Sequence, residues 1–433
     1  MPRRRLRAKV LKELKEINVR RSNDADIRRL FMYADDWDSD LDDLLAIEEE
    51  EDNQYLAIEE AVRSERYLFR AKNYRDRSDA FDFSDCLSEK SKRFNDDDFL
   101  SHFRVSRSSF CTIADLLAKS DCFWCFPGKR KKASVEKHLL VFLRRLGCEG
   151  VEGSRVSLAS FFGIGKGTVD LYVERVVDAL LELKDKVVIW PKGEKKETLK
   201  REIKCNFGFQ RCIGIIDGTI IILNDRPLKF GDSYWCRKHC YSLNVQVICD
   251  HNARVLYYFG GWPGSVHDNR AWRSSKIFRD GKFYFENGEY LVGDSAYSAC
   301  RFLVQSFKKL PGTSKLNPEK EWFNSMLGSL RVKSEHCIGM LKGRFPSLRR
   351  INIKVKGPKE IKKVMDLFGA AVVLHNLLLD CNDTIPSNWY FETKQEHYWT
   401  RDYQGIQDLD TNGDPNFDRR DAVFNSMLED YYS

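Results

Sequence analysis

The sequence predicts an α/β protein, a mixed sheet flanked by helices and preceded by an α-helical domain. Between about residues 98 and 190, apolar residues recur at the spacing of one helix face. After Pro191 the apolar period changes to two, which is typical of strands, and helical spacing returns further along the chain. Strands that come first and then alternate with helices indicate a sheet with helices on its faces.

Changes in composition divide the chain into four parts. A basic arm and an acidic stretch come first, and we expect this N-terminal region to be largely disordered. The predicted parts are residues 1–97, the N-terminal region; 98–190, the helical domain; 205–380, the sheet domain; and 381–433, an acidic C-terminal tail.

Charge is strongly segregated along the chain. The 72 Lys and Arg and 65 Asp and Glu residues give a net charge of +7. Residues 1–30 hold 11 basic and four acidic residues, whereas residues 31–60 hold 13 acidic residues and no basic one. Residues 301–363 hold 16 basic and four acidic residues, and residues 364–433 hold four basic and 13 acidic ones. Two basic blocks with acidic flanks indicate a polyanionic partner.

The first basic block, residues 1–30, is either a nuclear-import or DNA-contacting arm or a solvated helix.

Composition also limits the class of protein. No apolar run reaches the ~18 residues of a membrane span, so we expect no membrane contact. The 13 cysteines are odd in number and scattered, which is typical of reduced thiols in an intracellular protein. Cys122 and Cys125 have metal-ligand spacing, and Cys236, His239 and Cys240 lie close together, but neither set has the four ligands of structural zinc.

The helical domain begins with two amphipathic segments. Residues 99–117 place Phe99, Phe103 and Phe110 on one helical face, and residues 137–146 form another helix. These segments predict a packed helical core.

Residues 156–183 have a helix-turn-helix pattern. A short helix is followed by a turn at Gly163–Gly165 and by a longer helix that starts near Thr168. Such a pair either packs within the domain or places its second helix in a DNA major groove. Asp170 and Glu174, near the start of the second helix, weaken the DNA alternative.

The sheet domain shows both the period of two that is typical of strands and the spacing that is typical of helices. The predicted strands are residues 211–223, 242–249, 254–259 and 289–292, and the predicted helices are 269–274, 321–342 and 360–379.

Asp217 interrupts an otherwise apolar strand. A buried charge is costly unless it is paired, hydrogen-bonded or bound to a cation, so Asp217 is a candidate site residue. Alternatively, Asp217 and Gly218 form the turn of a hairpin.

Two further carboxylates stand out. Asp294 follows a strand, where α/β sheets bind ligands, although an Asp there is also a common helix cap or turn residue. Glu335 lies on a helix four residues after Arg331, and the plain interpretation of that spacing is a surface ion pair. Together with Asp217, two strand carboxylates and one helix carboxylate can converge to hold two Mg²⁺ ions, which cleave phosphodiesters. The basic block around Glu335 would then attract DNA phosphates.

At these residues the sequence resembles the DDE transposases of the PIF/Harbinger superfamily and their domesticated nuclease relatives. The resemblance extends over about residues 98–380. It rests on IIDGTII (215–221), GGWPGSVHDNRAW (260–272), VGDSAYS (292–298), RVKSEHCIGMLKGRFPSL (331–348) and LFGAAVVLHNLL (367–378), and upstream on HFRVSRSSF (102–110) and FFGIGKGTV (161–169).

The resemblance implies an RNase H-like DDE endonuclease domain. Its catalytic and metal-binding triad is Asp217, Asp294 and Glu335, with Mg²⁺ or Mn²⁺ as cofactor. His267 and Asp268 fall in a further family block and are expected to support the site or cap a helix. The residues that we expect to contact DNA are Arg331, Lys333, Lys342 and Arg344.

The resemblance therefore implies a nuclear, metal-dependent DNA endonuclease or transposase. Its expected partners are DNA and a separate Myb/SANT-like DNA-binding protein, with a homo-oligomer left open. The alternative is a domesticated, catalytically inactive DNA-binding or scaffolding protein that retains the fold. A two-metal hydrolase of small substrates is a third class, which the basic block disfavours.

Overall fold

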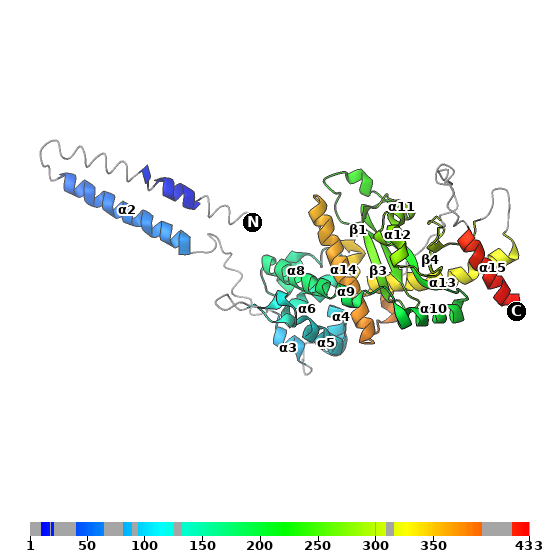
Figure 1. The fold of residues 1–433 in the computed structure, drawn as a ribbon. Coiled ribbons are helices and arrows are strands. Elements are labelled where there is room, and N and C mark those ends of the chain that lie inside the picture. The colour runs from blue at the N-terminus through cyan, green and yellow to red at the C-terminus, as the bar shows by residue number, and fades with distance from the viewer. Residues whose placement is uncertain are drawn as a thin grey trace. The chain divides into compact units, whose positions relative to one another are not determined.

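A computed structural model describes most of the chain and separates it into two compact units, residues 1–79 and 80–433. The first unit contains the acidic helix α2 (Asp40–Ser64). The described residues are 10–17, 19–20, 40–64, 81–88, 94–124, 132–298, 300–308, 316–391 and 418–432 (Figure 1). No helix within these ranges is both long enough and apolar enough to cross a membrane.

The second unit begins with a helical region. Its elements are α3 (Phe83–Leu87), α4 (Asp96–Phe103), α5 (Arg107–Leu117), η2 (Asp121–Phe123), α6 (Val135–Leu146), α7 (Arg155–Phe161), α8 (Lys166–Glu182) and α9 (Lys184–Val187). The predicted face at residues 99–117 is divided between α4 and α5, because Arg104 adopts a left-handed conformation with φ +67° and Ser106 caps α5. The region also reaches back to Phe81, which is buried in its core.

Helices α7 and α8 form the predicted helix-turn-helix. Helix α8 starts at Lys166, two residues before the predicted start, with Gly165 at its N-cap. It packs against α6 on one side and α14 (Pro358–Asp380) on the other. Its acidic side chains are paired, Asp170 with Arg155 and Glu174 with Lys363. These contacts support a packing role for α8.

The sheet is mixed, as predicted. It consists of β1 (Cys212–Leu223), β2 (Ser242–Cys249), β3 (Val255–Pro263), β4 (Tyr290–Val292), β5 (Leu303–Val304) and β6 (Arg350–Ile351). The order is β3-β2-β1-β4-β5, and β6 pairs with the end of β1. The strands β1, β2 and β3 are antiparallel, whereas β4, β5 and β6 join in parallel. Because β5 and β6 have only two residues each, they carry no period that the sequence could reveal.

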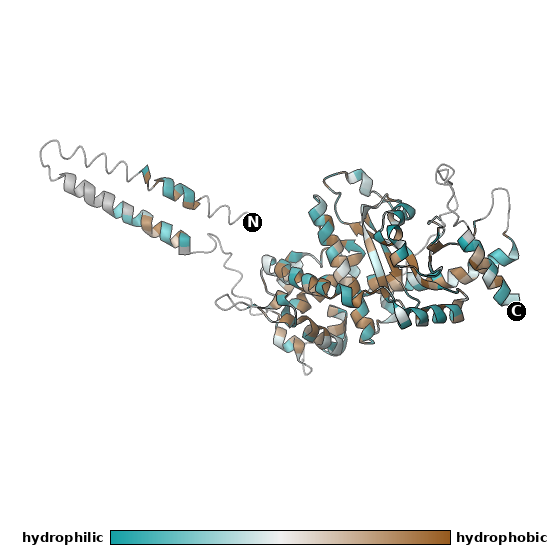
Figure 2. Cartoon of the chain, viewed as in Figure 1, coloured by the Kyte–Doolittle hydropathy of each residue, from teal (hydrophilic) through white to brown (hydrophobic). Residues whose placement is uncertain are grey.

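Helices cover the sheet and connect it to the helical region. They are α10 (Gly193–Phe207), α11 (Asp268–Arg273), α12 (Lys276–Arg279) and α13 (Pro318–Arg344), together with α14. Helix α13 contacts β1, α14 contacts β3 and α11 contacts β2 (Figure 1). One buried cluster contains Phe142 of α6, Val245 of β2 and Phe368 of α14, so the helical region and the sheet share a core. Figure 2 shows apolar residues, in brown, both in the helices and in the sheet of this unit.

The C-terminal range is not entirely irregular. Helix α15 (Asp418–Tyr432) lies in the part of the chain predicted as an acidic tail. Its Phe424 and Met427 are buried in the core that also holds Phe307 and Phe323. This helix is therefore an additional layer of the sheet domain.

Candidate active site

Asp217 lies within the central strand β1. The strand continues without a break from Cys212 to Leu223, so Asp217 and Gly218 do not form a hairpin turn. The Asp217 side chain is 9% exposed. Its Oδ1 accepts a hydrogen bond from the Gly218 amide at 2.8 Å, and its Oδ2 lies 3.5 Å from the hydroxyl of Ser334 on α13. A buried carboxylate thus stands between the sheet and α13.

Asp294 lies beside Asp217. Strands β1 and β4 are parallel and pair Ile215 with Val292. Asp217 comes two residues after Ile215 and Asp294 two residues after Val292, and Asp294 is near enough for its charge to raise the pKa of Asp217, to which burial contributes most. Asp294 follows the end of β4 and caps no described helix, but it does open a turn, because its carbonyl accepts a hydrogen bond from the Tyr297 amide at 3.1 Å.

Arg331 joins the second and third carboxylates. Its Nη1 lies 3.6 Å from Oδ1 of Asp294, and its Nη2 lies 3.8 Å from Oε1 of Glu335. Glu335 therefore belongs to a cluster with Asp294, and its contact with Arg331 is more than an isolated surface pair. The Arg331 side chain is only 16% exposed, and its Nε and Nη2 have no hydrogen-bond acceptor among the described residues.

Burial and nearby charges raise the proton affinity of Asp217. Burial raises the pKa of Asp217 from 3.8 to about 7. The Arg331 guanidinium opposes this rise, whereas Asp294, Asp268 and Glu335 add to it. Asp217 thus has one cationic and three anionic groups among its charged neighbours.

Asp268 is held in this environment by residues that the sequence interpretation missed. Its Oδ1 accepts hydrogen bonds from Asn244 at 2.8 Å and from Gln246 at 2.7 Å. Tyr297 in turn donates to the side chain of Gln246. A Cβ on Gly218 would lie 2.7 Å from Asp268 Oδ1, so this glycine permits the close approach.

A signal for these residues was present in the sequence. Ser242, Asn244 and Gln246 alternate with apolar residues along β2, which marks a polar face on a strand that is buried throughout. His267 caps α11, because its side chain accepts a hydrogen bond from the Asn269 amide at 3.4 Å.

The comparison with known protein families agrees with this geometry. Residues 216–376 match the model of a family described as a DDE superfamily endonuclease. The matched segment, called the DDE domain below, includes Asp217, Asp294 and Glu335. The match and the mixed sheet with its flanking helices together confirm the predicted fold class.

Two curated relatives from Arabidopsis thaliana align with this domain and beyond it. Protein Antagonist of Like Heterochromatin Protein 1 is 27% identical over 304 residues, which are 66% of this chain and 74% of the relative. Protein ALP1-like is 27% identical over 305 residues, which are 66% of this chain and 71% of the relative. No solved structure matches the chain significantly.

Two of the predicted DNA-contacting residues are buried in the DDE domain. Lys342 donates to the carbonyl of Ile220 at 2.7 Å, and burial lowers its pKa from 10.5 to about 7. Arg344 is ion-paired with Asp383 at 2.6 Å, and both side chains are nearly inaccessible. Their burial does not support DNA contact. Arg331 and the partly exposed Lys333 are the other two predicted residues.

The donor set of the DDE domain fits Mg²⁺ or Mn²⁺ in chemistry. All its donors are carboxylate oxygens, which Mg²⁺ prefers, and a cation would offset the negative charge of Asp294, Asp268 and Glu335, which adds to the effect of burial on the pKa of Asp217. Within the described ranges, no three His, Cys, Asp or Glu side chains are close enough together to form a metal site. The guanidinium of Arg331 lies between Asp294 and Glu335 instead. Of the suggested zinc pair, Cys122 contacts Glu182, and Cys125 lies outside the described residues.

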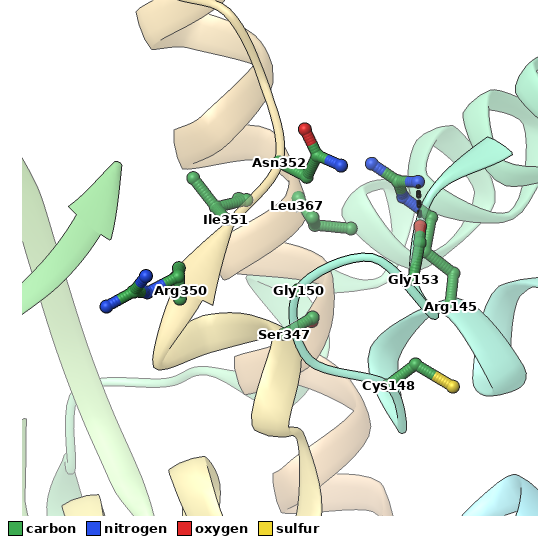
Figure 3. Close-up of a pocket in the computed structure, with 9 residues that line it drawn as sticks. All are labelled: Arg145, Cys148, Gly150, Gly153, Ser347, Arg350, Ile351, Asn352 and Leu367. Carbon is green, nitrogen blue, oxygen red and sulfur yellow. Dashed lines mark hydrogen bonds between the residues drawn. The ribbon is translucent and has the colours of Figure 1, made fainter. Parts of the chain in front are cut away.

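A small cavity occurs elsewhere in the unit, between the helical region and the segment that follows α13 (Figure 3). Arg145 and Ser347 are among its lining residues, and it contains none of the carboxylates. Arg145 already donates to the carbonyl of Gly153 at 2.8 Å. The carboxylate cluster is therefore the better candidate for the functional site.

The raised pKa of Asp217 predicts a pH-dependent effect on stability. Because the folded chain holds this proton more tightly than the unfolded chain, the stabilising contribution is full below pH 3.8 and is lost as the pH rises through about 7. We expect Asp217→Asn to raise the free energy of unfolding at pH 8 by about 2–4 kcal/mol and to change it little at pH 4. Thermal unfolding in EDTA at both pH values measures this difference. Equal stability of the two proteins at pH 8 would contradict it.

Proposed function

We propose that this chain is a metal-dependent DNA endonuclease or transposase of the Harbinger type. The observation that carries the proposal is the placement of Arg331, which contacts both Asp294 and Glu335 beside the buried Asp217, within a DDE superfamily endonuclease domain. Asp217 lies on β1, Asp294 follows the parallel strand β4, and Glu335 lies on α13. The proposed reaction is cleavage of a DNA phosphodiester by water, followed by attack of the freed 3′-hydroxyl on a target strand.

In this proposal each carboxylate has a separate task. Asp217 and Asp294 would hold two Mg²⁺ ions, for which Mn²⁺ could substitute, and Glu335 would be a further ligand. The chemistry that the bound metal supplies is activation of the attacking oxygen and stabilisation of the leaving oxygen. Asp268, fixed by Asn244 and Gln246, adds negative charge beside Asp217 and favours cation binding.

Arg331 is the residue that we expect to contact the DNA backbone at this site. Its Nε and Nη2 are buried without an acceptor in the described part of the chain. A buried donor that lacks an acceptor is costly, and a phosphate oxygen is a strong acceptor for a guanidinium. Lys333 is partly exposed on the same helix and would add to the attraction of phosphates.

The second candidate function is a domesticated protein that retains the fold for DNA binding or scaffolding. One relative is named Antagonist of Like Heterochromatin Protein 1, and that name favours a role in contacting proteins.

Under either function we propose a nuclear location. A separate Myb/SANT-like protein would supply sequence-specific DNA binding, and the acidic, packed helix α8 is consistent with that need. Self-association remains a proposal under both functions.

Titration with Mn²⁺ distinguishes the two functions. An enzyme of this type must bind divalent metal at the carboxylates, whereas a scaffold need not. We expect the full chain to remove free Mn²⁺ from solution, as measured by electron paramagnetic resonance, and Asp294→Asn to weaken that binding at least about tenfold. The control is Asp366→Asn, because Asp366 is similarly exposed and also ion-paired. Equal Mn²⁺ binding by all three proteins would reject the proposed site.

A further inference from the structure

The loop between β1 and β2, residues 224–241, presents unusually exposed apolar side chains. It contains the short helical turn η3 (Gly231–Tyr234) and lies at the end of the sheet where β1 finishes (Figure 1). Several large apolar side chains exposed on one short segment are unusual, because such residues are normally exposed singly. The exposed fractions are 74% for Leu228, 83% for Phe230 and 45% for Trp235, and on the adjoining β3 the fraction is 37% for Trp262.

The exposed rings are held in place by an ordered loop. Tyr234 and Cys236 are buried and anchor it from within. Trp235 forms a backbone bridge with Tyr241, and their rings lie 4.9 Å apart. Phe230 has φ +52°, a conformation that is strained for a bulky residue, and its side chain gains no burial in return. The exposure of the rings is therefore built into the fold of the loop.

The same loop is basic. Its basic residues are Arg226, Lys229, Arg237 and Lys238, all of them exposed. Its two acidic residues are already in ion pairs, Asp225 with Lys354 at 3.9 Å and Asp232 with Arg226 at 2.9 Å. Aromatic rings set among cations match a partner that offers both flat ring faces and negative charge.

The loop is connected to the carboxylate site by short contacts. The amide and hydroxyl of Ser265 both donate to the carbonyl of Ser233, which ties the loop to the turn before Asp268. Trp262 pairs across the sheet with Asn244, the residue that donates to Asp268.

The charge of the loop also acts on a residue beside the carboxylate site. Burial is the main cause of the lowered pKa of His267, and Arg237 of the loop lowers it further. The start of the loop lies about 23 Å along β1 from Asp217, at ~3.3 Å per residue. A DNA strand spans that distance with about seven nucleotides, at ~3.4 Å each.

We propose that residues 228–238 and Trp262 form a stacking platform for unpaired DNA bases next to the cleavage site. This inference rests on the proposed function, because it takes DNA as the ligand of the carboxylate site. The base faces of a duplex are hidden in the stack, so protruding rings can engage them only where the strands are separated. Arg237 and Lys238 bind the phosphates that accompany the bases, and the rings supply the preference for unpaired nucleotides.

Binding of two DNA probes tests the platform. One probe is a duplex with an unpaired arm that carries 2-aminopurine, and the other is a full duplex of the same length. The full chain is used with Asp294→Asn as background and with EDTA present, so that cleavage plays no part. We expect Trp235→Ala and Phe230→Ala each to weaken binding of the forked probe by about tenfold and to reduce quenching of 2-aminopurine. Affinity for the full duplex stays within about twofold, since no base face is offered there.

Two further variants complete the design. Trp235→Phe keeps a ring and is expected to retain most of the preference for the forked probe. Phe283→Ala removes an equally exposed ring outside the loop and should change nothing.

Equal losses on both probes, or no loss on either, would overturn the platform, and the second outcome would favour a protein partner for these rings. If the wild-type chain does not nick DNA but the preference for the forked probe is intact, only the proposed function is refuted.

Discussion

Replacing Asp294 by Asn is expected to reduce Mg²⁺-dependent nicking of DNA by about 1000-fold or more, as removal of a group that acts at the transition state does. The side chain keeps its size, so the fold and the packing around β4 are preserved. What changes is the charge next to Asp217, where the parallel register of β1 and β4 places Asp294. Conversion of supercoiled plasmid to the nicked form measures the effect.

The matched control for this variant is Asp366→Asn on α14. Asp366 is 30% exposed and ion-paired with Lys362, whereas Asp294 is 25% exposed and faces Arg331. We expect the control to nick DNA as the wild type does. Nicking by Asp294→Asn at the wild-type rate would remove this carboxylate from the mechanism.

Replacing Arg344 by Ala is expected to lower the free energy of unfolding by about 3–5 kcal/mol. The guanidinium is 3% exposed and Asp383 is 1% exposed, and the two groups lie 2.6 Å apart. Arg344 also donates to the carbonyl of Arg104, so it joins α13 to the helical region. Its removal leaves Asp383 as a buried and unpaired charge, which is why the expected loss is large. Urea-induced unfolding measures it.

Arg254→Ala provides the comparison for this loss. Arg254 pairs with Asp380 at 2.6 Å, but its partner is 55% exposed and Arg254 itself 33%. Such pairs contribute about 0–1 kcal/mol, so this variant should lose little stability. Similar losses in the two variants would show that burial of the Arg344 pair is not what makes it important.

The long elements of the sheet domain could be predicted from the sequence because their periods are clear. β2 occupies Ser242–Cys249, the predicted range, and β1 starts one residue after its predicted start. Periodicity does not reveal which strands are neighbours. The adjacency of Asp217 and Asp294 depends on the pairing of β1 with β4, and before the structure only the family resemblance pointed to it.

Charge counting identified the basic block but not the position of its members. Lys342 and Arg344 belong to the same block as Arg331, yet both are buried and used in packing, whereas Arg331 faces the carboxylates. The burial of Lys342 depends on the packing of α13 on β1, and the burial of Arg344 depends on its contact with Asp383, which follows α14. The support of Asp268 by Asn244 and Gln246 likewise depends on contacts between α11 and β2, which spacing in the sequence does not reveal.

The most direct measurement is nicking of supercoiled plasmid by the wild-type full chain in Mg²⁺ and, in parallel, in EDTA. If Asp217, Asp294 and Glu335 form a metal-dependent nuclease site, nicked product accumulates with Mg²⁺ or Mn²⁺ and is absent with EDTA. Product that forms equally in EDTA, or no product with either metal when the Mn²⁺ titration shows the site filled, would contradict the proposed enzyme and leave the scaffold as the function of this fold.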